Sequence, residues 1–259
     1  MPFAELAGGR IHYELEGPET APVVVFSNSL GADYSMWDPQ ARELTKNFRV
    51  LRYDMRGHGQ SSVTAGAYSI EQLAKDVVSL LDSLHLNRVH FCGLSMGGMI
   101  GMWLGLHVPE RLNKLILSST AAKIGTAEMW NTRIATVRKE GMKPVAAAAI
   151  ERWFTAGFRE KNPAAIGAVK KVLDETNPEG YAACCAAVRD FDFRDKVSGL
   201  RVPTLTIAGS HDPATTPADL RFLAENIPGA RYVELSGAHL CNVEDADRFN
   251  AEISAFLEA

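Results

Sequence analysis

The sequence has few cysteines and no long apolar run. Among its 259 residues only Cys92, Cys184, Cys185 and Cys241 carry thiols. None forms a CxxC pair or stands at the histidine spacing of a zinc site, which excludes a disulfide framework or a zinc finger. We expect reduced, mostly buried thiols. No window approaches the ~18 uninterrupted apolar residues of a membrane-spanning helix, so a membrane is not an expected partner.

An excess of positive charge is also missing. The 27 Lys and Arg residues are outnumbered by 31 Asp and Glu, which gives a net charge of −4. This balance provides no basic field for nucleic acid or for an anionic membrane surface. The first residues lack a positive stretch followed by an apolar one, so we expect no secretory signal and a cytoplasmic location. With 46% hydrophobic and 22% charged residues, the composition is that of a globular protein.

Apolar runs of strand length recur along the chain. Several are continuous Val, Leu and Ile, which is typical of strands covered by helices on both faces. Residues 69–85 instead carry a helical apolar stripe, with Ser69 as its N-cap. The alternation predicts an α/β fold with a mostly parallel, doubly wound sheet, whose first two strands form an antiparallel edge. The predicted strands are 10–17, 22–29, 48–55, 88–95, 112–120, 203–210 and 230–237.

The alternation of strand and helix stops in residues 121–197. This segment is rich in alanine and helix formers, and Gly141 and two Asn-Pro pairs break it. It predicts about four short helices inserted between two strands of the sheet. We therefore expect a core of residues 1–120 and 198–259, with residues 121–197 as a helical cap over one end of the sheet.

A serine within a run of small residues is the first candidate for chemistry. Residues 93–97, Gly-Leu-Ser-Met-Gly, match G-x-S-x-G after a predicted strand and before a predicted helix. A serine in so tight a turn has a strained backbone, and a side chain at either flanking glycine would collide with the neighbouring strand or helix. The motif predicts that Ser95 is a nucleophile, although such a serine can also serve only for packing.

Two further residues fit a catalytic triad with this serine. Asp212 and His239 each follow a later predicted strand, and the order Ser, Asp, His is that of α/β-hydrolases. A serine hydroxyl is a poor nucleophile near neutral pH, so His239 must accept its proton and Asp212 must orient the imidazole. His211 precedes the acid on the same turn, and we expect its side chain to point elsewhere.

Attack on an acyl carbon also requires hydrogen-bond donors for the oxyanion. The backbone N–H of Met96, directly after the nucleophile, is the first predicted donor. The second is expected in the turn Asn-Ser-Leu-Gly at residues 28–31, where we assign the N–H of Leu30. His58, in the segment Arg-Gly-His-Gly, is expected to brace a loop near the site and to have no direct chemical role.

With these residues, the chain resembles the α/β-hydrolase family over essentially its full length. The segments FSNSLGADYSMWD, YDMRGHGQS, GLSMGGMI, GSHDPATTP and GAHLCNVED occur in the order expected of that family. Within it, the chain looks like the 3-oxoadipate enol-lactonases, because of SNSLG in place of the commoner His-Gly opening, FCGLSMGG, and the cap segments MWNTR and ERWFT. The resemblance implies hydrolysis of a five-membered enol lactone with a carboxymethyl group to 3-oxoadipate, in the protocatechuate branch of the β-ketoadipate pathway.

The resemblance also implies a mechanism and a binding site. The route is a serine acyl-enzyme without metal or organic cofactor, with attack by a water molecule activated by the histidine as the open alternative. The free carboxylate of the substrate must be neutralised in an otherwise apolar pocket. We expect Arg133 to bind it, three residues after Trp130 on the same side of a cap helix. Trp130 and Trp153 are expected to line the pocket, although cap-to-core packing explains each aromatic equally well. Competing cations are Arg138, Arg152 and Arg159.

Other functions fit the same residues. A carboxylesterase, a hydrolase of carbon-carbon bonds in ring-cleavage products and a cofactor-free perhydrolase would keep the triad, so the cap must decide the substrate. A small-molecule receptor of the same fold would usually lack the nucleophile or the base, and here both are present. The sequence leaves the oligomeric state open, and a homo-oligomer is compatible with it.

Overall fold

A computed structural model describes residues 2–259. Its centre is an eight-stranded sheet in the order β1-β2-β4-β3-β5-β6-β7-β8. The strands from β4 onward in this order are parallel, whereas β2 runs antiparallel to both β1 and β4. The strand bounds are β1 Phe3–Leu6, β2 Gly9–Glu16, β3 Val23–Ser27, β4 Arg49–Tyr53, β5 Val89–Leu94, β6 Leu112–Ser118, β7 Thr204–Gly209 and β8 Arg231–Leu235.

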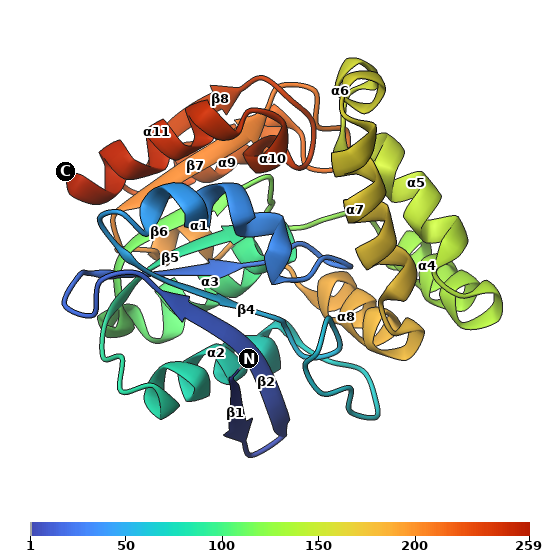
Figure 1. The fold of residues 1–259 in the computed structure, drawn as a ribbon, viewed down its shortest axis with the longest axis horizontal. Coiled ribbons are helices and arrows are strands. Elements are labelled where there is room, and N and C mark those ends of the chain that lie inside the picture. Colours follow the sequence, from blue (N-terminus) through green and yellow to red (C-terminus); the bar gives the residue numbers. More distant parts are fainter. Residues whose placement is uncertain (1) are drawn as a thin grey trace.

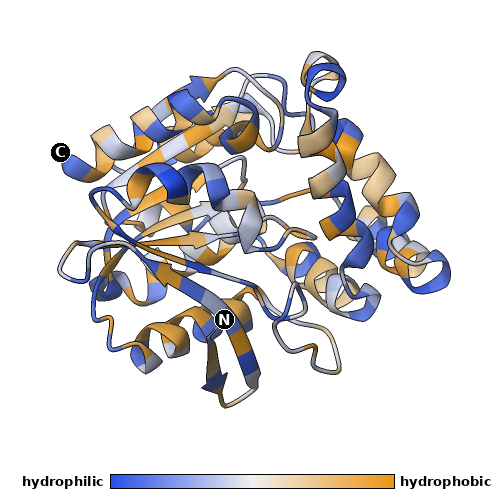
Figure 2. Cartoon of the chain, in the orientation of Figure 1, coloured by the Kyte–Doolittle hydropathy of each residue, from blue (hydrophilic) through white to orange (hydrophobic). Residues whose placement is uncertain are grey.

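Helices cover both faces of the sheet, as the doubly wound pattern predicts (Figure 1). Helix α1 packs against α11 on one face, and α2 packs against α3 on the other. The apolar colouring in Figure 2 is concentrated along the central strands. These layers confirm the predicted fold class. The bounds of the core helices are α1 Asp38–Leu44, α2 Ile70–Ser83, α3 Met96–His107, α9 Pro217–Asn226, α10 Cys241–Glu244 and α11 Ala246–Glu258.

Helix α2 illustrates how the sequence pattern gives the packing. The hydroxyl of Ser69 accepts a hydrogen bond from the backbone N–H of Gln72 (3.1 Å), which confirms the predicted N-cap. The apolar stripe that begins at Ile70 is buried against the sheet and α3.

The predicted antiparallel edge is wrong in its pairing. Strands at 10–17 and 22–29 were expected to pair, but β4 lies between β2 and β3. The edge is instead formed by β2 and the four-residue strand β1, which is too short to give a clear apolar pattern. Strand β3 lies inside the parallel part of the sheet, where both of its faces are buried. Consecutive strands in the sequence are not always neighbours, and strand patterns alone do not fix their order.

The cap contains five helices, one more than expected. They are α4 Ala127–Glu140, α5 Lys143–Trp153, α6 Ala156–Lys161, α7 Pro163–Glu175 and α8 Pro178–Asp190, and they stand together beside the sheet at the right of Figure 1. The unexpected division separates α5 from α6. There the side chain of Thr155 accepts a hydrogen bond from the backbone N–H of Phe158 (3.3 Å) and caps the new helix.

In residues 2–259 no helix combines the length and apolar character needed to span a bilayer.

Candidate active site

Ser95 occupies a strained turn between β5 and α3. Its backbone angles are φ 58° and ψ −115°, a region that residues with a side chain rarely adopt. The N–H of Ser95 donates to the carbonyl oxygen of Ser118 (3.0 Å), and its carbonyl oxygen accepts a hydrogen bond from Thr120 Oγ1 (2.7 Å). Both peptide groups of the turn are therefore tied to the end of β6, which fixes the position of the serine.

The glycines on either side of the serine are required by close backbone contacts. A Cβ atom at Gly93 would overlap the carbonyl group of Gly97. A Cβ atom at Gly97 would overlap the carbonyl oxygen of Ser27 at the end of β3. The steric reason given for the motif is confirmed, since a larger residue at either position would push strand and helix apart.

Asp212 follows β7 and His239 follows β8, and both side chains are buried. Asp212 Oδ2 lies 2.8 Å from His239 Nδ1, and Oδ1 accepts hydrogen bonds from the backbone N–H groups of Ala214 (2.8 Å) and Thr215 (3.1 Å). Burial by itself raises the pKa of Asp212, but the neighbouring His239 and the hydrogen bonds outweigh it, so this pKa lies below its ordinary value. The ionised carboxylate favours the tautomer with hydrogen on Nδ1, which leaves Nε2 as a proton acceptor.

Thr215 is a residue of this site that the sequence analysis missed. Its hydroxyl donates to Asp212 Oδ2 (2.7 Å) and lies 3.3 Å from His239 Nδ1. The side chain is buried and also lines the cavity described below. The available signal was a hydroxyl residue three positions after the acid, in GSHDPATTP.

His211, next to the acid, is exposed. Its Nδ1 lies 2.8 Å from Ser210 Oγ. The expectation that it points away from the site is confirmed.

The turn at residues 28–31 leaves one backbone donor free. The N–H of Ser29 donates to Met36 Sδ (3.3 Å) and that of Gly31 to His58 Nε2 (2.8 Å). Between them, the N–H of Leu30 meets no acceptor within residues 2–259, and Leu30 lines the cavity. Met96 is the first residue of α3, where backbone N–H groups have no partner inside the helix. Its fully buried side chain is not part of the cavity wall.

His58 supports the turn at residues 28–31 through its contact with Gly31, in keeping with the role expected for it. Burial lowers its pKa to about 4, so the imidazole is neutral at neutral pH. The neutral ring accepts at Nε2 from Gly31 and has Nδ1 3.4 Å from the carbonyl oxygen of Arg56. A neutral histidine is needed here because a protonated ring could not accept the hydrogen bond from Gly31.

A cavity of about 330 Å³ lies between the core and the cap. This volume suits a small organic ligand. The core contributes Ser95, His239 and Leu30 to its wall, and the cap contributes the three residues predicted to bind substrate, Trp130, Arg133 and Trp153. The structure thus brings the predicted nucleophile, the predicted base and the predicted binding residues to one cavity.

Two arginines face this cavity. The guanidinium carbon of Arg133 lies 4.6 Å from the centre of the Trp130 ring, and Arg152 lines the same space. Burial lowers the pKa of Arg152, and the positive charge of Arg133 lowers it further. Burial also raises the pKa of Tyr181, another wall residue, against the opposing effect of both arginines. Within residues 2–259 neither arginine forms an ion pair, so together they give the cavity an uncompensated positive charge.

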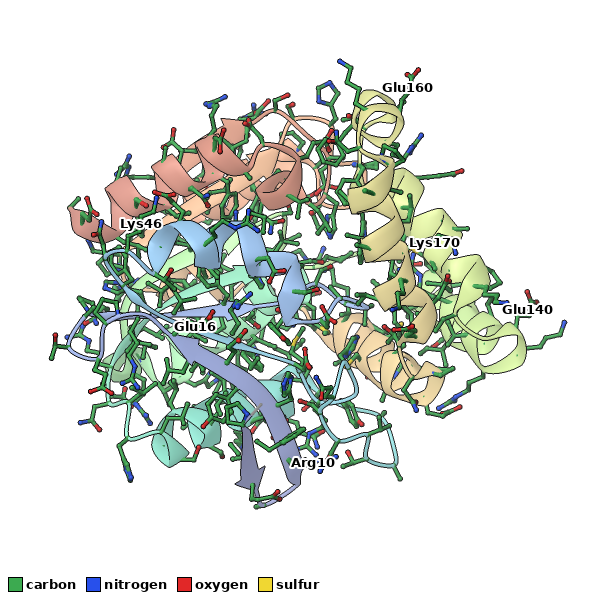
Figure 3. All side chains as sticks on the ribbon, in the orientation of Figure 1. Arg10, Glu16, Lys46, Glu140, Glu160 and Lys170 are labelled. Carbon is green, nitrogen blue, oxygen red and sulfur yellow. The ribbon has the colours of Figure 1, made fainter. Side chains whose placement is uncertain are left out.

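The other two competing cations are engaged elsewhere. Arg138 forms an exposed ion pair with Glu179 (3.1 Å), and Arg159 donates to the carbonyl oxygens of Glu151 and Phe154. Figure 3 shows Glu140 and Glu160 projecting from the cap away from the core. Charged side chains thus cover the outside of the cap, whereas Arg133 and Arg152 line its inner side.

No group of three His, Cys, Asp or Glu side chains suited to a metal ion occurs in residues 2–259. The four cysteines are free and buried, as expected.

Comparison with known proteins agrees with this geometry. Residues 22–246 match the sequence pattern of the family described as the alpha/beta hydrolase fold. The chain is 42% identical to 3-oxoadipate enol-lactonase 2 of Acinetobacter baylyi, over 96% of this chain and 93% of that one. It is 38% identical to 3-oxoadipate enol-lactonase 1 of the same organism, over 97% and 94%. The crystal structure of the enol-lactonase from Burkholderia xenovorans LB400 superposes with a TM-score of 0.98, at 46% identity and full coverage of both chains. On fold, turn geometry and sequence, the chain belongs to the α/β-hydrolase fold family.

Proposed function

We propose that the protein hydrolyses 3-oxoadipate enol-lactone to 3-oxoadipate, as a serine hydrolase of carboxylic esters. The observation that carries the proposal is a single cavity lined by Ser95 and His239 from the core and by two arginines without ion pairs, Arg133 and Arg152, from the cap. Such a cavity suits an ester that also bears a free carboxylate. The near full-length similarity to proteins named enol-lactonases supports this choice of substrate.

In the first half of the reaction, Ser95 Oγ attacks the lactone carbonyl carbon while His239 Nε2 takes the hydroxyl proton. Asp212, held at Nδ1 of the same ring at 2.8 Å, stabilises the resulting imidazolium. The backbone N–H groups of Leu30 and Met96 are the proposed donors to the oxyanion, each worth roughly 3 to 4 kcal/mol when well placed. The ring C–O bond then breaks, and the enol oxygen leaves with its electron pair.

The second half releases the product. The enolate takes up a proton at carbon, supplied by the imidazolium of His239, and becomes the ketone of 3-oxoadipate, still bound to Ser95 as an acyl ester. This transfer returns His239 to its neutral form. Water then attacks this ester with His239 as the general base, and the serine leaves with the returned proton. An enolate is a weaker base than an ordinary alkoxide, so the ring opening needs little help from a general acid. Neither half requires a metal or an organic cofactor.

The carboxymethyl group is proposed to bind Arg133, with Arg152 as a second cation. Both arginines are half-buried and have no acidic partner within residues 2–259, so their positive charges repel each other, and an anionic ligand between them relieves this repulsion. Trp130 holds the Arg133 guanidinium by a cation-π contact, which limits the freedom that the arginine loses on binding. A neutral ester would gain nothing from either arginine, so this pair favours a carboxylate-bearing lactone over a simple carboxylesterase substrate.

The first test follows the ultraviolet absorbance of the lactone with the wild-type protein and with Ser95→Ala. We expect fast turnover that disappears in Ser95→Ala, whereas Ser210→Ala, a serine outside the cavity wall, keeps it. A serine-directed phosphonate should label the wild type and Ser210→Ala with one phosphonate group per chain, as measured by the increase in protein mass. It should not label Ser95→Ala. Slow lactone turnover together with faster cleavage of 4-nitrophenyl acetate would discard the lactonase and retain a carboxylesterase.

The second test concerns the carboxylate. Arg133→Ala should raise KM for the lactone far more than KM for 4-nitrophenyl acetate, because only the lactone carries the anionic group. Arg152→Ala should act in the same direction, and Arg138→Ala, which alters only the exposed pair with Glu179, should change neither KM. Equal effects of Arg133→Ala on the two substrates would remove this residue from the binding site.

The protein is further expected to act without nucleic acid or membrane partners. Its cytoplasmic location and the possible homo-oligomer stay predictions from the sequence.

A further inference from the structure

A second cavity, of about 220 Å³, shares a wall residue, Trp153, with the active-site cavity. It is formed between the core and helix α7 of the cap. Its wall is mostly apolar, with Met36 and Leu240 from the core and Val169 and Val172 from α7. Among the residues that the structure describes, Trp153 alone belongs to the walls of both this cavity and the active-site cavity. The two spaces are therefore neighbours that meet at Trp153.

The backbone and ring of Trp153 are both held in place. Its carbonyl oxygen accepts a hydrogen bond from the N–H of Leu240 (3.1 Å), the residue that follows the histidine of the site. Its indole stacks toward His239, with ring centres 6.2 Å apart and planes inclined by 30°. Only 6% of the residue is exposed. Glu244 also joins the segment of Trp153 to that of His239, since its carboxylate accepts hydrogen bonds from the backbone N–H groups of Ala238 (3.0 Å) and Thr155.

The wall of the second cavity contains two carboxylates, Asp33 and Asp38, beside its apolar residues. Asp38 forms an ion pair with Arg52 (2.5 Å), whereas Asp33 has no ion pair within residues 2–259. A carboxylate entering this space would meet the charge of Asp33, in contrast to the active-site cavity with its two arginines. The chemistry of the wall suits a neutral aliphatic chain.

We propose that Trp153 is the partition that limits the enzyme to short acyl groups, and that a neutral aliphatic acyl chain occupies the second cavity when the indole is removed. This inference rests on the proposed function, since it concerns substrates attacked by Ser95. It assigns to Trp153 a role in specificity beyond that of a pocket wall. The closed partition also keeps the small lactone in the space that contains the two arginines.

The test compares kcat/KM for 4-nitrophenyl esters from acetate to octanoate. In the wild type, kcat/KM should fall as the acyl chain lengthens beyond the first cavity. In Trp153→Ala it should rise with length, by about fourfold for each methylene that enters the apolar space. The ratio of hexanoate to acetate is the measured quantity, because a general loss of activity from the altered contact with His239 cancels in it. Trp153→Leu serves the same purpose if the alanine variant does not fold.

The matched control is a variant in which a larger side chain fills the second cavity. Val169 lies in the second cavity and not in the first, so Val169→Phe alone should leave the wild-type length profile unchanged. Combined with Trp153→Ala, it should cancel the gain for long chains, and Ala165→Phe offers a second way of filling the same space. A chain of equal length that ends in a carboxylate should gain less than the neutral chain.

Two outcomes overturn the inference. A flat or falling length profile in both Trp153 variants would mean that the second cavity does not accept the acyl chain. A gain that survives Val169→Phe and Ala165→Phe would place the chain elsewhere. Failure of the proposed function is distinguishable, because it appears as slow turnover of the enol lactone, whereas the length profile requires only that 4-nitrophenyl esters are cleaved through Ser95, which Ser95→Ala checks separately.

Discussion

Replacing His58 by leucine should damage catalysis although this residue is not expected to touch the substrate. Its Nε2 atom is the acceptor for the N–H of Gly31, next to the proposed oxyanion donor at Leu30. Leucine has no acceptor, so the buried N–H of Gly31 would lose its partner. The turn at residues 28–31 can relieve this only by moving, and the N–H of Leu30 moves with it.

The structure sets the scale of the effect. A buried backbone N–H without a partner costs about 1 to 3 kcal/mol. In His58→Leu this cost falls on the N–H of Gly31 and favours a movement of the turn that gives this group a new partner. Complete loss of one oxyanion donor lowers kcat by about 10² to 10³. We expect His58→Leu to lower kcat between about 10-fold and 10³-fold. The KM for the lactone should change little, because the donor acts mainly in the transition state.

The assay measures kcat and KM with the lactone for three variants. His58→Gln places an amide oxygen near the position of Nε2 and should recover a large part of kcat. His211→Leu removes an exposed histidine from the neighbourhood of Asp212 and should have no effect. If His58→Leu lowers the melting temperature while kcat stays at the wild-type value, the turn does not depend on His58 and the reasoning is refuted.

Three further results are expected. Asp212→Asn should lose on the order of 10⁴ in kcat because the imidazole tautomer is no longer fixed, and near-normal turnover would mean that another acid serves. Thr215→Val removes a donor that helps to lower the pKa of Asp212, so this pKa, followed by NMR of the carboxyl carbon, should rise, and Thr215→Ser should restore it. Because the folded-state pKa of His58 is about 4 and its ordinary value is 6.5, the unfolded chain takes up this proton first, and stability falls as the pH drops from 6.5 toward 4. Urea unfolding should therefore show that the wild type loses more stability over this range than His58→Gln, by up to about 3 kcal/mol, and equal losses in both proteins would contradict the burial argument.

The serine turn was readable from the sequence because it is a local structure. Backbone strain at Ser95 and the close contacts at Gly93 and Gly97 restrict the residue types within five positions, so the motif carries its own geometry. The apolar strand patterns determined the fold class in the same way, because each of them depends on neighbours in the chain. The order of serine, acid and base added a signal that is read directly along the sequence.

Contacts between distant segments were decided only by the tertiary structure. The insertion of β4 between β2 and β3, the donation from Thr215 to Asp212 and the brace of His58 under Gly31 leave no periodic signal. Among the four candidate arginines of the cap, the sequence could not tell which face the cavity, because helix packing, and not composition, turns Arg133 and Arg152 inward. The sequence by itself determined which chemical groups are present and in which order. Packing of the cap on the core decided which of them meet, since side chains far apart in the chain are brought together only when their elements share a surface.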